Sequence, residues 1–134
     1  MKAKDILKER HGYIAFALDE QSRNILLKSF PPKYPEVIGQ HITHQFGVPE
    51  GTKLPSELKD VKVIGYADDG ISLEALVVAI NGSTQRPDGG TYHITWSLDR
   101  EQGRKPVHSN NLIKEQGYER ISPIQITAIP RWFR

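Results

Sequence analysis

The chain of 134 residues is 37% hydrophobic and 25% charged, which predicts one globular domain over residues 1–134. Its formal net charge of +2 argues against a duplex DNA-binding protein but is compatible with a small anionic ligand. The absence of cysteine excludes disulfides, a thiol nucleophile and a cysteine zinc site. Residues 1–10 lack the apolar run of a signal peptide and no stretch approaches membrane-spanning length, so we expect a soluble, cytoplasmic protein that does not bind a membrane.

The first half of the chain is expected to form two strands and two helices. A short charged helix is expected around residues 4–10, and the apolar run 13–18 has the length of a buried strand. Asp19 is expected to cap a helix that presents one apolar face and ends before Pro31. The segment 41–46, closed by glycine and proline, is expected to be a short strand.

The second half is expected to be rich in strands. We expect strands over residues 61–66, 71–80, 91–98 and 121–129. The Asp69-Gly70 pair predicts a hairpin between the first two of these strands, and Ser109 is expected to cap a short helix that runs to Gln116. This mixed order predicts an α+β fold, a single compact domain of antiparallel sheets with flanking helices.

Two of the expected strands contain the same tripeptide, His-Ile-Thr. It occupies His41 to Thr43 in one strand and His93 to Thr95 in the other. Side chains alternate between the faces of a strand, so each histidine and the threonine two residues later point the same way. Each strand therefore presents an imidazole beside a hydroxyl on one face.

Alternation also predicts what the opposite faces carry. His44 and Phe46 are expected on the face of Ile42, away from His41, so we expect a structural role for His44. In the other strand Ile94, Trp96 and Leu98 are expected to form an apolar core face. A zinc site made of histidines would have to unite opposite strand faces, so no metal is expected.

Paired histidines suit the cleavage of a phosphodiester. The reaction needs a base to activate the attacking oxygen and an acid to protonate the leaving oxygen, and histidine titrates in the range where it can do either. We expect His41 and His93 to be this catalytic pair, without assigning which is the base, and Thr43 and Thr95 to bind the phosphate. The alternative is that both histidines are ordinary strand residues, hydrogen-bonded by their neighbours.

The two His-x-Thr elements resemble the paired signatures of the 2H phosphoesterase superfamily, including its cyclic phosphodiesterase-like members. The resemblance implies two lobes related by a pseudo-two-fold axis, each supplying one motif to a central cleft. It also implies action on 2′,3′-cyclic phosphates, 2′-5′ linkages or cyclic oligonucleotides without a metal or other cofactor. By the same resemblance His41 and His93 are the acid and base, and Thr43 and Thr95 hold the phosphate.

Five further residues are candidate substrate contacts. Arg86, Arg104 and Lys105 lie in loops that flank the strand of His93, where they can hold nonreacting phosphates. A solvated charged loop explains these cations equally well. Tyr34 and Trp132 are candidates for stacking on bases. Asp68 and Asp69 are also paired acids, but the glycine that follows them favours a turn.

These features predict a metal-independent phosphodiesterase that acts on RNA or a nucleotide. A 2′,3′-cyclic phosphate at an RNA end is the first expected substrate, with 2′-5′ linkages and cyclic oligonucleotides as variants, and no obligatory protein partner is expected. The first alternative is a noncatalytic RNA-binding module that uses the basic loops and aromatic residues. A second is a structural protein in which the His-x-Thr repeats have no chemical role.

Overall fold

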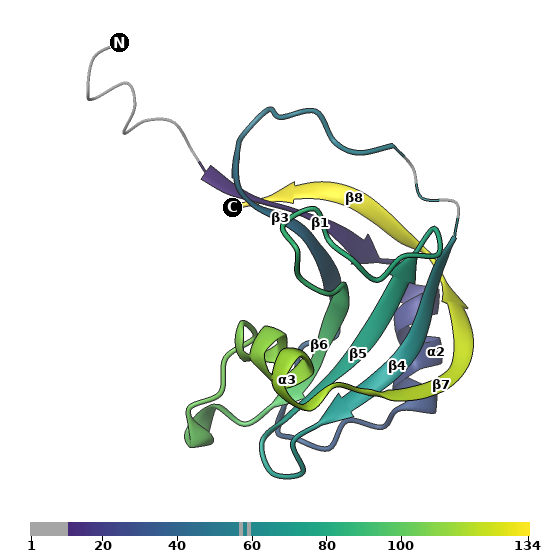
Figure 1. Cartoon of the computed structure of the whole chain (residues 1–134), viewed down its shortest axis with the longest axis vertical. Coiled ribbons are helices and arrows are strands. Elements are labelled where there is room, and N and C mark those ends of the chain that lie inside the picture. The colour runs from purple at the N-terminus through teal and green to yellow at the C-terminus, as the bar shows by residue number, and fades with distance from the viewer. Residues whose placement is uncertain (1–10, 57, 59) are drawn as a thin grey trace.

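A computed structural model of the chain describes residues 11–56, 58 and 60–134 (Figure 1). These residues form an α+β fold of two antiparallel sheets, two α-helices and a 3-10 helix at Arg100–Gln102, as the order of predicted elements indicated for the fold class. The helix expected around residues 4–10 lies outside the described residues. Within the described part of the chain, no helix is both long and apolar enough to cross a membrane.

The smaller sheet has three strands: β1 (His11–Leu18), β3 (His41–Pro49) and β8 (Ala128–Phe133), in the order β3-β1-β8. The central strand, β1, contains the predicted strand at residues 13–18, and its residues Ile14, Ala15 and Phe16 are buried. The edge strand β3 begins at His41 as predicted and continues to Pro49. The first motif therefore lies at the start of an edge strand.

The larger sheet has five strands: β2 (Glu36–Val37), β4 (Val61–Asp68), β5 (Leu73–Ile80), β6 (His93–Leu98) and β7 (Glu119–Ile126), in the order β2-β6-β5-β4-β7. The expected hairpin at Asp69-Gly70 joins β4 and β5. The very short β2 was not predicted. β6, which carries the second motif, is buried along its whole length between β2 and β5.

The prediction of one strand over residues 121–129 is wrong, because the chain changes sheets at Thr127. The Thr127 N–H donates to the Ser22 hydroxyl at 2.7 Å, and its carbonyl accepts from the Asp19 N–H at 3.2 Å. Both bonds take the chain out of the β7 ladder, and β8 then pairs with β1 in the other sheet. A strand that crosses between sheets needs such a bend, and single-residue periodicity does not reveal it.

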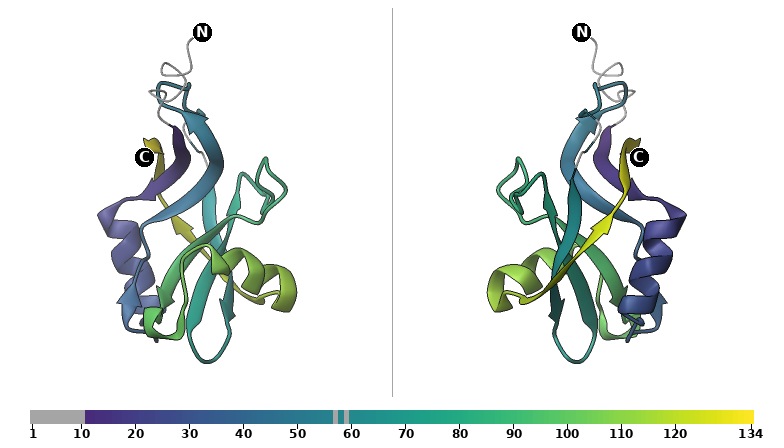
Figure 2. Two further views of the ribbon diagram at one scale, coloured as in Figure 1. Left: turned by 90° about the vertical axis from the view of Figure 1, so that its left-hand side faces the viewer. Right: turned by 90° about the vertical axis from the view of Figure 1, so that its right-hand side faces the viewer.

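The two α-helices of the described residues lie on opposite sides of the five-stranded sheet (Figure 2). The first, α2 (Glu20–Ser29), is capped as predicted, since the Asp19 carboxylate accepts from the Ser22 N–H at 2.7 Å. The second, α3 (His108–Gln116), begins at His108, and its N-cap residue Val107 makes no side-chain capping bond. The expectation that Ser109 caps α3 is wrong, because Val107 already has helical angles and Ser109 is buried in the first turn.

The helices cover two hydrophobic clusters, one on each face of the five-stranded sheet. The first cluster contains Leu26 of α2, Trp96 of β6 and, from the smaller sheet, Phe16 and Ile42. The second cluster contains residues of α3 together with Leu98. Because the Ile42 and Trp96 side chains point into the first cluster, the motif side chains that alternate with them point away from it. This arrangement sets β3 and β6 side by side (Figure 1).

Candidate functional site

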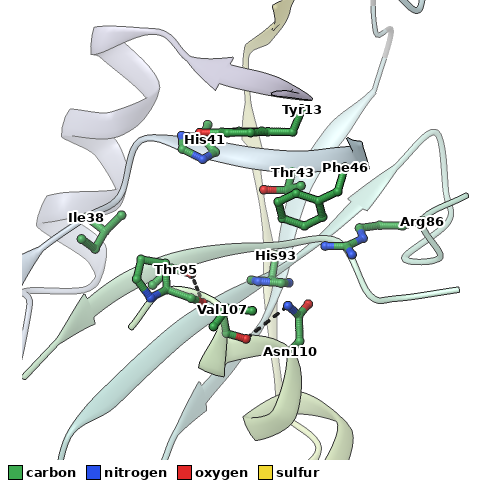
Figure 3. A pocket seen from close by; sticks show the side chains of 11 residues that line it. Tyr13, Ile38, His41, Thr43, Phe46, Arg86, His93, Thr95, Val107 and Asn110 are labelled. Atoms are coloured by element: carbon green, nitrogen blue, oxygen red, sulfur yellow. Dashed lines mark hydrogen bonds between the residues drawn. The ribbon is translucent and has the colours of Figure 1, made fainter. Parts of the chain in front are cut away.

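Both His-x-Thr motifs line one cavity of about 330 Å³ between the two sheets. His41 and Thr43 come from β3, and His93 and Thr95 come from β6 (Figure 3). The first turn of α3 and Arg86 also line this cavity, which we call the motif cavity. The prediction that each histidine and its threonine share a strand face agrees with this geometry.

Hydrogen bonding fixes the tautomer of His93. Its Nδ1 lies 2.8 Å from the carbonyl oxygen of Thr91, which can only accept, so Nδ1 carries the hydrogen. In the neutral ring Nε2 then holds a free lone pair. His93 is only 7% exposed, and burial lowers its pKa, as do the positive charges of Arg86 and His41. The Thr91 bond opposes this shift without reversing it, so His93 is neutral near pH 7 and ready to accept a proton.

Aromatic packing orients His41. Its ring lies 5.6 Å from the ring of Tyr13 and stacks on Phe133 at 5.2 Å, measured between ring centroids. Burial lowers the pKa of His41 as well. Among the described residues its ring nitrogens have no hydrogen-bond partner, so they remain available to a ligand in the motif cavity.

The two threonines differ in how free their hydroxyls are. Thr95 Oγ1 donates to the carbonyl of Pro106 at 3.2 Å and lies 2.9 Å from the Ser109 hydroxyl. A hydroxyl has one hydrogen, so Thr95 can donate to a phosphate only by giving up Pro106. The Thr43 hydroxyl has no such competitor within the described residues and lines the cavity. Thr43 is therefore the readier donor.

A β-bulge brings Phe46 into the motif cavity. Adjacent residues of β1 pair with Thr43 and Gln45, which leaves His44 as an extra residue in β3. The bulge shifts the alternation, so Phe46 lines the cavity with His41 and is 54% exposed. The expectation that Phe46 lies on the opposite face from His41 is wrong for this reason.

The second motif is followed by a bulge of the same kind. Adjacent residues of β5 pair with Thr95 and Ser97, which leaves Trp96 as the extra residue. Trp96 is fully buried in the first cluster as expected, but Leu98 packs in the second cluster, so the prediction that both share one face is wrong. Each motif thus has a threonine followed directly by a bulge.

His44 occupies a structural position, as expected. Its ring packs against Phe16 at 5.0 Å, and its Nδ1 lies 2.7 Å from the Tyr92 hydroxyl. Both partners belong to the first hydrophobic cluster. His44 is thus turned toward the core and does not line the motif cavity.

Arg86 is the one candidate cation that lies at the motif cavity. It is 6% exposed, and its Nε and Nη2 donate to the carboxylate of Asp88 at 3.0 and 2.5 Å. Its guanidinium also lies over the Phe46 ring, 5.7 Å from the centroid. These contacts hold a positive charge against the cavity wall near His93.

No group of three or more His, Asp or Glu side chains among the described residues is arranged to hold a metal ion. Comparison of the chain with protein-family models, with curated proteins and with solved structures finds no match. The functional proposal is therefore based on the geometry of the motif cavity.

The other four candidate contacts lie outside the motif cavity: Arg104, Lys105, Tyr34 and Trp132. Arg104 donates to Asp69 at 3.0 Å, and the Tyr34 hydroxyl donates to Asp68 at 2.6 Å. The backbone N–H of Lys105 donates to a histidine of α3, and the Trp132 indole donates to a carbonyl of β3. The structure therefore brings five of the nine candidate residues together.

Asp68 and Asp69 stabilise the β4-β5 turn, as the sequence predicted. Burial raises the pKa of Asp69, but bonds from the Ser72 hydroxyl and from three backbone N–H groups outweigh it and lower that pKa to about 2. Asp68 accepts from the Gly70 N–H at 2.8 Å. Neither carboxylate lines the motif cavity.

Sequence reasoning missed several residues of the cavity wall. Asn110 on α3 donates to the carbonyl of Val107 at 3.2 Å, and Val107 is 58% exposed at the rim. Ile38 reaches the cavity because its N–H donates to the Trp96 carbonyl at 2.8 Å. At Gly39 φ is +49°, and a Cβ would lie 2.8 Å from the Trp96 ring, so this approach to β3 requires glycine. That glycine was the only sequence signal for this part of the wall.

Proposed function

We propose that the protein is a metal-independent phosphodiesterase that opens a 2′,3′-cyclic phosphate at the end of an RNA or a nucleotide. One observation carries the proposal: two His-Ile-Thr elements, from different sheets, direct their histidines and threonines into one cavity of about 330 Å³. Histidines on two walls allow a base and an acid to act on opposite sides of one phosphorus atom. Each such proton transfer contributes roughly 10²- to 10⁴-fold to the rate.

His93 is the base in this proposal. Its Nδ1 hydrogen is held by the Thr91 carbonyl, so Nε2 offers the lone pair. The nearby charge of Arg86 disfavours the protonated ring. A water molecule attacks phosphorus and transfers its proton to Nε2 of His93 as the new P–O bond forms.

His41 is the acid. Burial lowers its pKa, but a bound phosphate anion favours the imidazolium, as do the faces of the Tyr13 and Phe133 rings. As the bond between phosphorus and one ribose oxygen breaks, His41 donates its proton to that oxygen. The products are a phosphate monoester and a free ribose hydroxyl, and exchange with solvent restores both histidines.

Hydroxyl and guanidinium donors stabilise the charge on the nonbridging oxygens. Thr43 supplies a free hydroxyl, and the guanidinium of Arg86, which is paired with Asp88, lies at the same wall. Thr95 joins them when its hydroxyl turns away from Pro106. The loss of one such donor typically costs about 10²- to 10³-fold in kcat.

The apolar part of the cavity favours a nucleotide over a simple phosphodiester. The rings of Tyr13 and Phe46 and the side chains of Ile38 and Val107 line it beside the polar motif residues. Aromatic faces of this kind stack on bases, and small-molecule cavities combine such walls with a few convergent polar groups. 2′-5′ linkages and cyclic oligonucleotides present the same phosphate and base groups, so they are variant substrates in this proposal. We propose that the protein acts on RNA in the cytoplasm.

The proposal includes two pseudo-symmetric lobes, each supplying one motif as in the 2H phosphoesterases. Two local similarities support it. Thr43 and Thr95 each pair with an alanine of the neighbouring strand, Ala15 in β1 and Ala75 in β5. In both strands the bulge follows the threonine directly.

Turnover in EDTA tests the proposal. We expect the wild type to convert 2′,3′-cyclic nucleotides or cyclic-phosphate-ended RNA, and His41→Ala and His93→Ala each to lose about 10²- to 10⁴-fold in kcat. The control is His11→Ala, since His11 is exposed at the start of β1 and outside the motif cavity. No turnover by the wild type, or full activity in both variants, contradicts the proposal. RNA binding that depends on salt but not on either histidine would instead favour a noncatalytic module.

A further inference from the structure

A second cavity, of about 500 Å³, opens beside the motif cavity. Arg86, His93 and Asn110 line both cavities, so the two spaces adjoin along these side chains. The second cavity extends along α3, where Asn111 and Lys114 form its wall. We call this second cavity the α3 groove.

The α3 groove leaves the motif cavity at one end. In Figure 3, Arg86 and Asn110 lie to one side of His93, whereas Ile38 and Thr95 lie to the other. A ligand whose phosphate sits at His93 can therefore continue past Arg86 and Asn110 into the groove. The reaction proposed at the paired histidines and their threonines gives no role to Asn111 and Lys114, which line the α3 groove.

The chemistry of the α3 groove differs from that of the motif cavity. Its walls carry the amides of Asn110 and Asn111 and the ammonium of Lys114. The groove also contains Asp88, but Arg86 pairs with that carboxylate through two hydrogen bonds. The remaining positive charge is that of Lys114, which is exposed in the last turn of α3. Amide and ammonium donors of this kind bind phosphate and sugar oxygens.

The sizes of the two spaces point to a substrate longer than one nucleotide. A volume of about 330 Å³ is at the low end of the roughly 300–1,000 Å³ that is usual for small-molecule sites. We infer that the substrate carries a second nucleotide, whose phosphate and sugar lie in the α3 groove beside Asn111 and Lys114. This inference rests on the proposed phosphodiesterase activity and narrows its substrate to an oligonucleotide, linear or cyclic.

The test compares short and long substrates in two lysine variants. The substrates are a 2′,3′-cyclic mononucleotide, a four-nucleotide RNA with a terminal 2′,3′-cyclic phosphate, and a cyclic dinucleotide. The matched control for Lys114→Ala is Lys28→Ala, because Lys28 is also an exposed lysine in the last turn of a helix, α2. Both changes weaken a favourable helix-end charge, but only Lys114 lines the groove.

We expect the wild type to have a higher kcat/KM on one of the two longer substrates than on the mononucleotide. Whichever longer substrate has the higher kcat/KM shows whether the natural oligonucleotide is linear or cyclic. Lys114→Ala lowers kcat/KM on that substrate by about 3- to 10-fold and leaves the mononucleotide unchanged. It also reduces the dependence of log kcat/KM on log salt concentration by about 0.7. Equal kcat/KM on all three substrates, or equal effects of Lys114→Ala and Lys28→Ala, overturns the inference.

A binding measurement separates this inference from the proposed activity. The probes are a labelled four-nucleotide RNA with a 3′-phosphate and the matching nucleoside 3′-monophosphate. If the wild type turns over no substrate, the proposed activity fails, but weaker binding of the RNA alone by Lys114→Ala still supports the groove as an oligonucleotide site. Unchanged RNA binding by this variant overturns the inference whether or not the protein is an enzyme.

Discussion

The acid–base pair predicts a pH profile with its maximum on the acidic side of neutrality. The pH dependence of kcat/KM reports on the free enzyme, in which His93 must be neutral and His41 must be protonated. Burial lowers the pKa of each histidine below its ordinary value of about 6.5, and the charge of Arg86 lowers the pKa of His93 further. Both limbs of the bell-shaped profile therefore lie below pH 6.5, and so does the maximum.

The fall in kcat/KM with rising pH follows from the protonated fraction of His41. Above its pKa this fraction falls about tenfold per pH unit, so kcat/KM at pH 8.5 should be about 100-fold below its value at pH 6.5. The assay is kcat/KM on one cyclic-phosphate substrate from pH 4.5 to pH 8.5 in EDTA. Arg86→Gln removes a charge that lowers the pKa of His93, so the acidic limb should move to higher pH. A maximum at or above pH 7, or an acidic limb unmoved in this variant, refutes the assignment of roles.

Three further predictions concern the walls of the motif cavity and the fold. Thr43→Val should lower kcat more than Thr95→Val does. Thr95→Val should lower the free energy of unfolding by about 1–3 kcal/mol in urea titrations, because Ser109 loses its buried hydrogen-bond partner. Phe46→Ala should raise KM for nucleotides by about 5- to 150-fold with little change in kcat, because stacking on a base is worth roughly 1–3 kcal/mol. Stability should fall as pH drops below 6.5, because the unfolded chain then binds more protons than the buried histidines do, and urea unfolding at pH 7.5 and pH 5.5 measures this loss.

Residue alternation predicted the main feature of the site but not its full wall. It placed the histidine and threonine of each motif on one strand face, and both pairs line the motif cavity. It failed for Phe46 and Leu98, because each follows a bulge that adds one residue to its strand. A bulge depends on pairing with a neighbouring strand, and a single strand's pattern does not encode it.

Charge and aromaticity were poorer guides than alternation. Arg104 and Tyr34 are residue types that often contact nucleotides, but they donate hydrogen bonds to Asp69 and Asp68 near the β4-β5 turn instead. Asn110 carried no sequence signal, because its place at the cavity depends on how α3 packs against β4 and β5. The same packing forms the α3 groove, which therefore became visible only in the folded chain.

The fold was predictable where local signals were strong. The Asp19 cap, the β4-β5 hairpin and the start of β3 all follow from capping, turn and strand signals in the sequence. The change of sheet at Thr127 depends on hydrogen bonds to the distant α2 region, which no local pattern specifies.

The most direct test of the central claim follows the phosphorus atom itself. Phosphorus NMR in EDTA monitors an RNA with a terminal 2′,3′-cyclic phosphate in the presence of the wild type, His41→Ala, His93→Ala and the double variant. Groups that act as a unit are not additive, so we predict conversion to a monoester by the wild type, its loss in each single variant, and little further loss in the double variant. A cyclic phosphate left intact by the wild type, or conversion that persists in either single variant, would contradict the paired-histidine account.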